Sequence, residues 1–471
     1  MEEFELSDET KIGLDDYLCC HSVEELQKLP LTEIKEGEDV SVKKTKKRDE
    51  ACTKRNNLQT AKKLIDKYKI IRGAEQLYKY TDGYYKEIDL YDTKKIILDE
   101  YGETQQGNIN DIVDKIKIFS KVELGMFNSP KYLNLKNGLF DIEEYELVSH
   151  TPSIYSTIRL EIEYNKNTQC PKWIDAVNEI VDDPENINTL QEFFGLCLTT
   201  ETYDKALILT GEGSNGKSTL LDVLGGILGD DNISHVPLVR LEDTNFVAQL
   251  HGKLLNIASE IGSKTTVCDE TFKKIITHDK IMGAHKYAHP FSFRPVCKLI
   301  FATNDMPRTN DKTKALYRRL LVIHLINEFA GDTEKHKYHR ELLEEKDGIF
   351  NWLVEGLVRL RERGNFAMGK KIISAVEEYK KDNNPIISFI DDRCKIGTDE
   401  TVSKKDMFDE YKNYCNDSAF KPLSKIKFGK GLKRCLDSQV IDAQNKSGSE
   451  KIWRGISVSE RREQSGMIRV Y

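Results

Sequence analysis

The sequence predicts an α/β protein built on a parallel sheet, with the central part of the chain as its core. In the segment 206–224, a short apolar run leads into a glycine-rich loop and then into a helical stretch. Two further apolar runs, 253–260 and 296–304, each end in a polar side chain. Apolar strands that alternate with helices are typical of a parallel sheet covered by helices. Residues 204–330 are therefore expected to form this core.

The composition excludes several classes of protein. Of the 471 residues, 32% are charged, and no apolar run is long enough to cross a membrane. The first residues show neither the basic nor the apolar segment of a secretion signal, so none is expected. The ten cysteines include no Cys-x-x-Cys pair, which argues against a zinc site or a disulfide framework. We expect reduced thiols in a cytosol and no membrane partner.

Charge is unevenly distributed along the chain. Residues 1–42 hold 13 Asp and Glu against 3 Lys and Arg, whereas residues 421–471 hold 12 Lys and Arg against 5 Asp and Glu. This asymmetry suggests a C-terminal end that binds nucleic acid. The basic run 43–48 is either a solvated linker or a weak phosphate contact. Together, residues 1–56 are predicted to be an acidic arm and a basic linker.

Residues 57–190 are predicted to form an α/β or α+β module. The spacing indicates a helix over 61–68, a hairpin over 76–88, a strand–turn–strand over 134–141, and a helix that starts at Pro171. No catalytic constellation is present in this module. Its aromatic pairs either stack on bases or pack within the hairpins.

A phosphate-binding loop is predicted where the first core strand ends. Gly211 is followed after four residues by Gly216, Lys217 and Ser218, the pattern G-x-x-x-x-G-K-[ST]. A strand, a glycine turn and a helix N-terminus direct backbone N–H groups and a positive dipole end at one anion. We expect Lys217 to neutralise the β/γ-phosphates of ATP and the Ser218 hydroxyl to bind Mg²⁺. The residues expected to bind the nucleotide are Gly211, Glu212, Gly213, Ser214, Asn215, Gly216, Lys217, Ser218 and Thr219. The alternative is a glycine turn with a surface lysine.

The next two core strands end in candidate catalytic side chains. Glu260 follows the run 253–259 and is expected to assist Mg²⁺ and activate the attacking water. Asn304 follows the run 296–303 and is expected to position water against the γ-phosphate. The alternative for Asn304 is a turn cap.

A hairpin is predicted between these two strands, with His285, Lys286 and Tyr287 near its tip. A cation beside an aromatic ring at a loop tip suits a sugar–phosphate backbone, although a solvated hairpin is the alternative.

Two arginines, Arg318 and Arg319, precede the fourth apolar run. An arginine can stabilise the γ-phosphate during transfer and is sometimes supplied by a neighbouring subunit. A surface ion pair is the alternative.

The last segment, 386–471, has the pattern of a winged helix. Helices are predicted at 386–393, 404–415 and 426–435, followed by a hairpin with a basic polar loop. The residues expected to contact DNA on or near the recognition helix are Lys425, Lys427, Lys430, Lys433 and Arg434. A solvated lysine-rich helix is the alternative.

The ordered motifs resemble those of superfamily 3 helicases, and specifically the phage, plasmid and poxvirus-type primase–helicases. They are GEGSNGKST, LHGKLLNIASE, DKIMGAHKYAHPFSF, KLIFATNDMP and ALYRRLLVI. Upstream, NLKNGLFDIEEYELVSHTP, CPKWI and LQEFFGLCLT resemble the N-terminal helicase-associated domain of that branch. The replication initiator (Rep) proteins of staphylococcal pathogenicity islands are a nearer likeness.

The resemblance implies a hexameric AAA+ ring that hydrolyses ATP and moves 3′ to 5′ on single-stranded DNA. It assigns 57–190 to the helicase-associated domain and 191–380 to the AAA+ domain with a helical extension, before the winged helix at 386–471. Arg319 is then the first candidate for the arginine finger and Arg318 the second. His285 and Lys286 fall on a DNA-gripping hairpin of the central pore. Forked DNA, origin duplex DNA and a bacterial cytoplasm are the implied setting.

The sequence departs from the family pattern at three points. Only one carboxylate, Glu260, follows Ser259 where relatives have two, and 277–279 replaces a glycine-rich turn. No primase catalytic set precedes the helicase region, so primer synthesis is not predicted.

Two rival functions stay open. One is a different P-loop enzyme, such as a kinase or a DNA-packaging motor. The other is a nucleotide-gated origin-binding initiator without processive unwinding.

Overall fold

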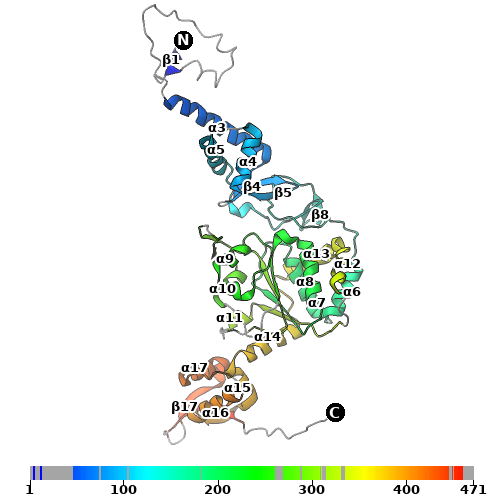
Figure 1. Cartoon of the computed structure of the whole chain (residues 1–471). Coiled ribbons are helices and arrows are strands. Elements are labelled where there is room, and N and C mark those ends of the chain that lie inside the picture. Colours follow the sequence, from blue (N-terminus) through cyan, green and yellow to red (C-terminus); the bar gives the residue numbers. More distant parts are fainter. Residues whose placement is uncertain are drawn as a thin grey trace, which may run out of the picture. The chain divides into compact units, whose positions relative to one another are not determined.

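The structure is a computed structural model that divides into two compact units, Met1–Arg159 and Leu160–Tyr471 (Figure 1). It describes residues 4–5, 11–12, 46–73, 76–102, 105–181, 183–259, 269–286, 289–307, 309, 314–329, 335–418, 420–444, 448 and 450–459. None of the helices in these ranges combines the length and apolarity that spanning a bilayer requires. The four-part division of the chain stays a prediction.

The first unit joins helices to small antiparallel sheets. Its helices are α3 (Lys46–Tyr68), α4 (Leu90–Tyr101) and α5 (Gln106–Phe119), with a short turn η1 (Leu124–Met126). Its strands are β1 (Phe4–Glu5), β2 (Lys11–Ile12), β3 (Ile71–Gly73), β4 (Gln76–Thr81), β5 (Tyr84–Ile88), β6 (Tyr132–Leu135), β7 (Gly138–Asp141) and β8 (Glu146–Val148). They form the sheets β1-β2, β3-β4-β5 and β6-β7-β8.

The hairpins predicted in this unit are confirmed. β4 and β5 pair antiparallel around Asp82 and Gly83, whose φ angles are 51° and 87°. Aromatic rings of this hairpin pack against each other. Tyr85 is buried, and its ring contacts those of Tyr80 and Tyr155. The helix predicted from residue 61 begins earlier, at Lys46, and therefore overlaps the predicted arm and linker.

The second unit is organised on a five-stranded parallel sheet in the order β10-β11-β14-β9-β15. These strands are β9 (Ala206–Thr210), β10 (Ile233–Ser234), β11 (Leu255–Ser259), β14 (Lys298–Thr303) and β15 (Leu320–His324). Every residue of β9 and β14 is buried, as expected for strands covered on both faces. The predicted α/β class with a parallel sheet is confirmed, and only the short edge strand β10 was missed.

Helices cover both faces of this sheet (Figure 1). On one face, Ile208 and Phe301 pack with Phe272 and Ile275 of helix α10 and with Tyr379 of helix α14. The helices of the sheet region are α6 (Pro171–Val181), α7 (Pro184–Leu196), α8 (Lys217–Leu228), α9 (Thr244–Val247), α10 (Asp269–Ile276), α11 (Lys314–Tyr317), α12 (Lys335–Leu343), α13 (Lys346–Arg363) and α14 (Lys370–Asp382). The hairpin strands are β12 (Ile281–Gly283) and β13 (Phe291–Phe293).

A buried carboxylate joins α7 to α13. Glu192 is fully buried, and its Oε1 accepts a hydrogen bond from Arg359 Nε at 2.8 Å. Its Oε2 lies 2.5 Å from Arg363 Nη2 and also accepts from Ala367 N at 3.2 Å. Both carboxylate oxygens are therefore paired, which the burial of a charge requires.

Replacing Glu192 with alanine is expected to destabilise the second unit by about 3–5 kcal/mol, because two arginines lose their buried partner. Urea unfolding followed by tryptophan fluorescence measures this loss, since Trp173 and Trp352 contact each other on α6 and α13 with ring centroids 5.7 Å apart. The matched control is Glu377→Ala, which breaks an exposed pair with Lys380 and should cost less than about 0.5 kcal/mol. Equal losses for the two variants would contradict a structural role for the Glu192 cluster.

The end of the second unit contains the three predicted helices and the predicted terminal hairpin. They are α15 (Pro385–Arg393), α16 (Lys404–Asp417), α17 (Lys425–Leu436), β17 (Ile441–Gln444) and β18 (Lys451–Val458). An unpredicted strand, β16 (Cys394–Ser403), pairs with β18 and completes an antiparallel sheet in the order β16-β18-β17. Phe389, Tyr411, Phe428 and Trp453 lie in the shared core.

Candidate nucleotide site and DNA-facing elements

The loop between β9 and α8 requires its two motif glycines. Gly211 has a φ of 149° and Gly216 a φ of 82°, a region that side chains disfavour. A Cβ atom on Gly211 would lie 2.4 Å from the carbonyl oxygen of Leu325, and one on Gly216 would lie 2.7 Å from Ile180 Cγ1. Both positions therefore exclude a side chain sterically as well as conformationally.

The ammonium group of Lys217 lies against its own loop. Its Nζ donates to the carbonyl oxygens of Gly211 at 2.6 Å and Glu212 at 3.0 Å, and to Asn215 Oδ1 at 2.8 Å. Burial lowers the pKa of Lys217 below its ordinary value. The loop thus holds a cation within reach of an anion that enters it.

The N-terminus of α8 opens onto the same loop. Gly216 is its N-cap residue and has no side chain with which to cap the first turn. Ser218 is exposed in that turn. Unpaired N–H groups at a helix N-terminus, together with the helix dipole, form an anion site.

The carboxyl ends of β9, β11 and β14 lie together on the side of the sheet where the loop begins. Thr210 of β9 pairs with Thr303 of β14, and Ser259 of β11 pairs with Ala302. Asn304 is exposed directly after β14, one strand away from the loop. Glu260 follows Ser259 but lies outside the described residues, so its catalytic role stays a prediction. No group of three His, Cys, Asp or Glu side chains suited to a metal occurs in the described part of the chain.

Two contacts at this edge escaped the sequence prediction. The Nδ1 atom of His324, the last residue of β15, lies 3.0 Å from Thr210 Oγ1. The buried Asn215 donates through Nδ2 to the Leu325 carbonyl at 3.1 Å while it accepts from Lys217. His324 ends an apolar strand in a polar side chain, the same signal that selected Glu260 and Asn304.

The two arginines lie at the amino ends of the strands, opposite the end that carries the phosphate loop. Leu320, the first residue of β15, pairs with Ala206, the first residue of β9, so Arg318 and Arg319 precede the strand at its amino end. A strand of five residues spans about 16 Å. Arg318 is exposed, and Arg319 Nη1 donates to the Ala315 carbonyl. Neither arginine therefore belongs to the phosphate loop of its own chain.

The predicted hairpin is present as β12 and β13. His285 and Lys286 are exposed between the two strands, and the His285 ring stacks on Phe291 with centroids 5.3 Å apart. Tyr287 lies outside the described residues. The stacked ring fixes the base of the turn that carries Lys286.

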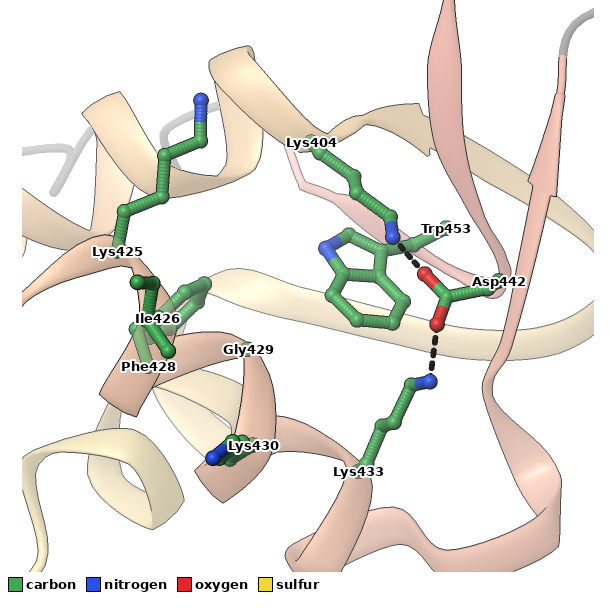
Figure 2. Close-up of a pocket in the computed structure, with 9 residues that line it drawn as sticks. All are labelled: Lys404, Lys425, Ile426, Phe428, Gly429, Lys430, Lys433, Asp442 and Trp453. Carbon is green, nitrogen blue, oxygen red and sulfur yellow. Dashed lines mark hydrogen bonds and ion pairs between the residues drawn. The ribbon is translucent and has the colours of Figure 1, made fainter.

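The candidate DNA-binding residues of the C-terminal segment lie along α17. Lys425, Lys427, Lys430, Lys433 and Arg434 are all exposed there. Three of these lysines, with Lys404 of α16, line a pocket of about 240 Å³ (Figure 2). The buried Trp453 of β18 also lines this pocket.

Three segments match known families. Residues 43–182 match a family described as D5 N terminal like, and residues 381–454 match Poxvirus D5 protein-like. Between them, residues 209–319 match a family of unknown function, DUF5906.

Similar proteins point the same way. A candidate helicase, L207/L206, of Acanthamoeba polyphaga mimivirus is 21% identical over 436 residues, which cover 75% of this chain and 44% of that protein. Apo structures of the NrS-1 C-terminal region cover 85% of this chain and 99–100% of their own, with a TM-score of 0.52 and 13–14% identity. Over 85% of its length, this chain therefore shares a fold with the NrS-1 C-terminal region.

These matches make the chain similar to the phage- and poxvirus-type primase–helicases. The D5-type matches lie on either side of the central match, and the phosphate loop and the arginine pair fall within that central match. The chain spans less than half the length of the mimivirus protein. The nearer likeness to staphylococcal island Rep proteins stays a prediction.

Proposed function

We propose that this chain is the subunit of an ATP-dependent replicative DNA helicase. It assembles as a hexameric AAA+ ring and moves 3′ to 5′ on single-stranded DNA. It acts at forked DNA in a bacterial cell, and a mobile genetic element encodes it. Support comes from the family relationship, from the phosphate loop, and from a parallel sheet with the strand β14 between the loop strand and β11.

The phosphate loop supplies the nucleotide site in this proposal. The Lys217 ammonium and the N–H groups at the start of α8 bind the β/γ-phosphates of ATP. The exposed Ser218 hydroxyl and Glu260 would hold Mg²⁺, since both offer the oxygen ligands that this ion prefers. When bound, Mg²⁺ neutralises charge on the transferring phosphate. Asn304, at the same sheet edge, orients the attacking water.

The observation that carries the proposal is the separation of the two charged groups. Lys217 follows the carboxyl end of β9, whereas Arg318 and Arg319 precede the amino end of the adjacent strand β15. One chain holds Lys217 and the two arginines at opposite ends of its strands. An arginine can therefore reach a γ-phosphate only from another subunit. A ring in which each subunit completes its neighbour's site meets this requirement.

The hairpin and the C-terminal segment supply the DNA contacts. The exposed His285 and Lys286 contact the translocating strand. The basic helix α17 belongs to a winged-helix domain that contacts duplex DNA at a fork or an origin.

Replacing Lys286 with alanine is expected to abolish unwinding of forked DNA and the stimulation of ATP hydrolysis by single-stranded DNA. The reason is that the hairpin loses the ammonium group with which it contacts the translocating strand. A strand-displacement assay on labelled forked DNA, together with native mass, measures activity and assembly. Lys280→Ala is the matched control, since Lys280 is exposed just before β12 rather than between the hairpin strands. Normal unwinding by the Lys286 variant would remove the hairpin from the mechanism, and no unwinding by the native protein would end the helicase proposal.

A second candidate function is an origin-binding initiator gated by nucleotide, without processive unwinding. The lysine-rich pocket of the C-terminal segment favours it, because duplex binding alone would employ these side chains. Tight duplex binding and ATP turnover without strand displacement would select this candidate.

A further inference from the structure

The pocket in the C-terminal segment already contains an anion of its own chain. Asp442, on β17, forms ion pairs with Lys404 and Lys433, which come from two different helices (Figure 2). The Nζ atom of Lys404 lies 4.2 Å from the centroid of the Trp453 ring, and that of Lys433 lies 5.7 Å from it. The Asp442 carboxylate thus lies between two ammonium groups, both of which are near the Trp453 ring.

The pocket also contains lysines that are not paired with this carboxylate. Lys425 and Lys430 also line it, and neither forms an ion pair in the residues that the structure describes. Four lysines therefore line the pocket, and only Lys404 and Lys433 pair with its single carboxylate. Burial and the charge of Lys433 lower the pKa of Lys404, as expected where cations are crowded together. A further anion would relieve this repulsion.

The Asp442 carboxylate is partly exposed to solvent. Its side chain is 44% exposed, that of Lys433 is 47% exposed, and that of Lys404 is 24% exposed. Ion pairs at such exposure contribute little to stability, because water solvates the separated groups well. Asp442 also lies on β17, an edge strand of its sheet, where its side chain can turn toward solvent.

We propose that this pocket is a phosphate-binding site and that Asp442 is an internal competitor which the phosphate displaces. A phosphate group offers several acceptor oxygens to lysines that approach from α16 and α17, whereas a carboxylate offers two. The phosphate comes either from a DNA backbone or from a free phosphate compound. The DNA source rests on the proposed role of the C-terminal segment, and the phosphate site itself does not.

The first arm of the test measures duplex DNA binding by the full chain as a function of salt. We expect Asp442→Asn to tighten binding by about fivefold, because one repelling charge leaves the pocket. It should also steepen the plot of log affinity against log salt by about 0.9. Asp399→Asn, which removes an equal charge from β16 outside the pocket, should change neither. Lys433→Ala should cost more affinity in the Asp442→Asn background than in the native chain.

The second arm titrates inorganic phosphate and follows tryptophan fluorescence. Trp453 lines the pocket, and a Trp453→Phe variant identifies its share of the signal. We expect Asp442→Asn to respond at lower phosphate concentrations than the native chain. A response to phosphate that also competes with DNA assigns the site to both sources, and a response to DNA alone assigns it to backbone phosphate.

The outcomes separate this proposal from the proposed DNA role. Absence of DNA binding together with a phosphate response that Asp442→Asn strengthens would end the DNA role and leave the phosphate site standing. Asp442→Asn behaving like Asp399→Asn in both arms would overturn the phosphate site, even if the native chain binds DNA.

Discussion

Replacing Lys217 with alanine is expected to lower ATP hydrolysis by at least about a hundredfold and to abolish DNA unwinding, because charge on the β/γ-phosphates loses its fixed counterion. The fold should persist, because the side chain is only half-buried and makes hydrogen bonds within its own loop. Steady-state phosphate release, with and without single-stranded DNA, measures the effect.

The matched control is Lys253→Ala, which removes a lysine of the same unit whose Nζ donates to the Asp231 carbonyl at 2.6 Å. This variant should keep native turnover. Full turnover by the Lys217 variant would show that the glycine loop is not the catalytic phosphate site.

Replacing Arg319 with alanine is expected to lower ATP hydrolysis by about 10³-fold or more, the usual effect of losing an arginine finger. Nucleotide binding should persist, because Lys217 and the loop are untouched. Fluorescent nucleotide binding and turnover are measured together, and native mass verifies that the variant still assembles.

Arg318→Ala is the comparison variant for this prediction. Arg318 is exposed and Arg319 is held by the Ala315 carbonyl, so the larger loss identifies which one reaches the neighbouring nucleotide. Native turnover by both variants would exclude this arginine pair from catalysis.

The sheet could be predicted from sequence because its signals are local. The strands β9, β11 and β14 are short apolar runs, and the glycine spacing at 211 and 216 has one common use beside such a strand. The lengths of these runs placed the strands to within one or two residues, and the alternation with helices implied a parallel sheet.

The remaining features depend on contacts between distant segments. β16 contains Gly397 and several charged residues, and it becomes a strand because it pairs with β18 some 55 residues later. The Asp442 pairs join two helices to β17, and no spacing in the sequence indicates them. The position of β15, the strand that follows the two arginines, beside the loop strand β9 also required the strand order, which sequence patterns leave open.

The central claim is that one subunit's Lys217 and its neighbour's Arg319 act on the same nucleotide. Mixing the inactive Lys217→Ala and Arg319→Ala chains and measuring ATP hydrolysis tests it directly. In a random equal mixture, about a quarter of the seams should pair an intact loop with an intact arginine, so activity should reappear. Mixed assemblies that form, as native mass would show, yet stay inactive at every ratio would contradict a site shared between subunits.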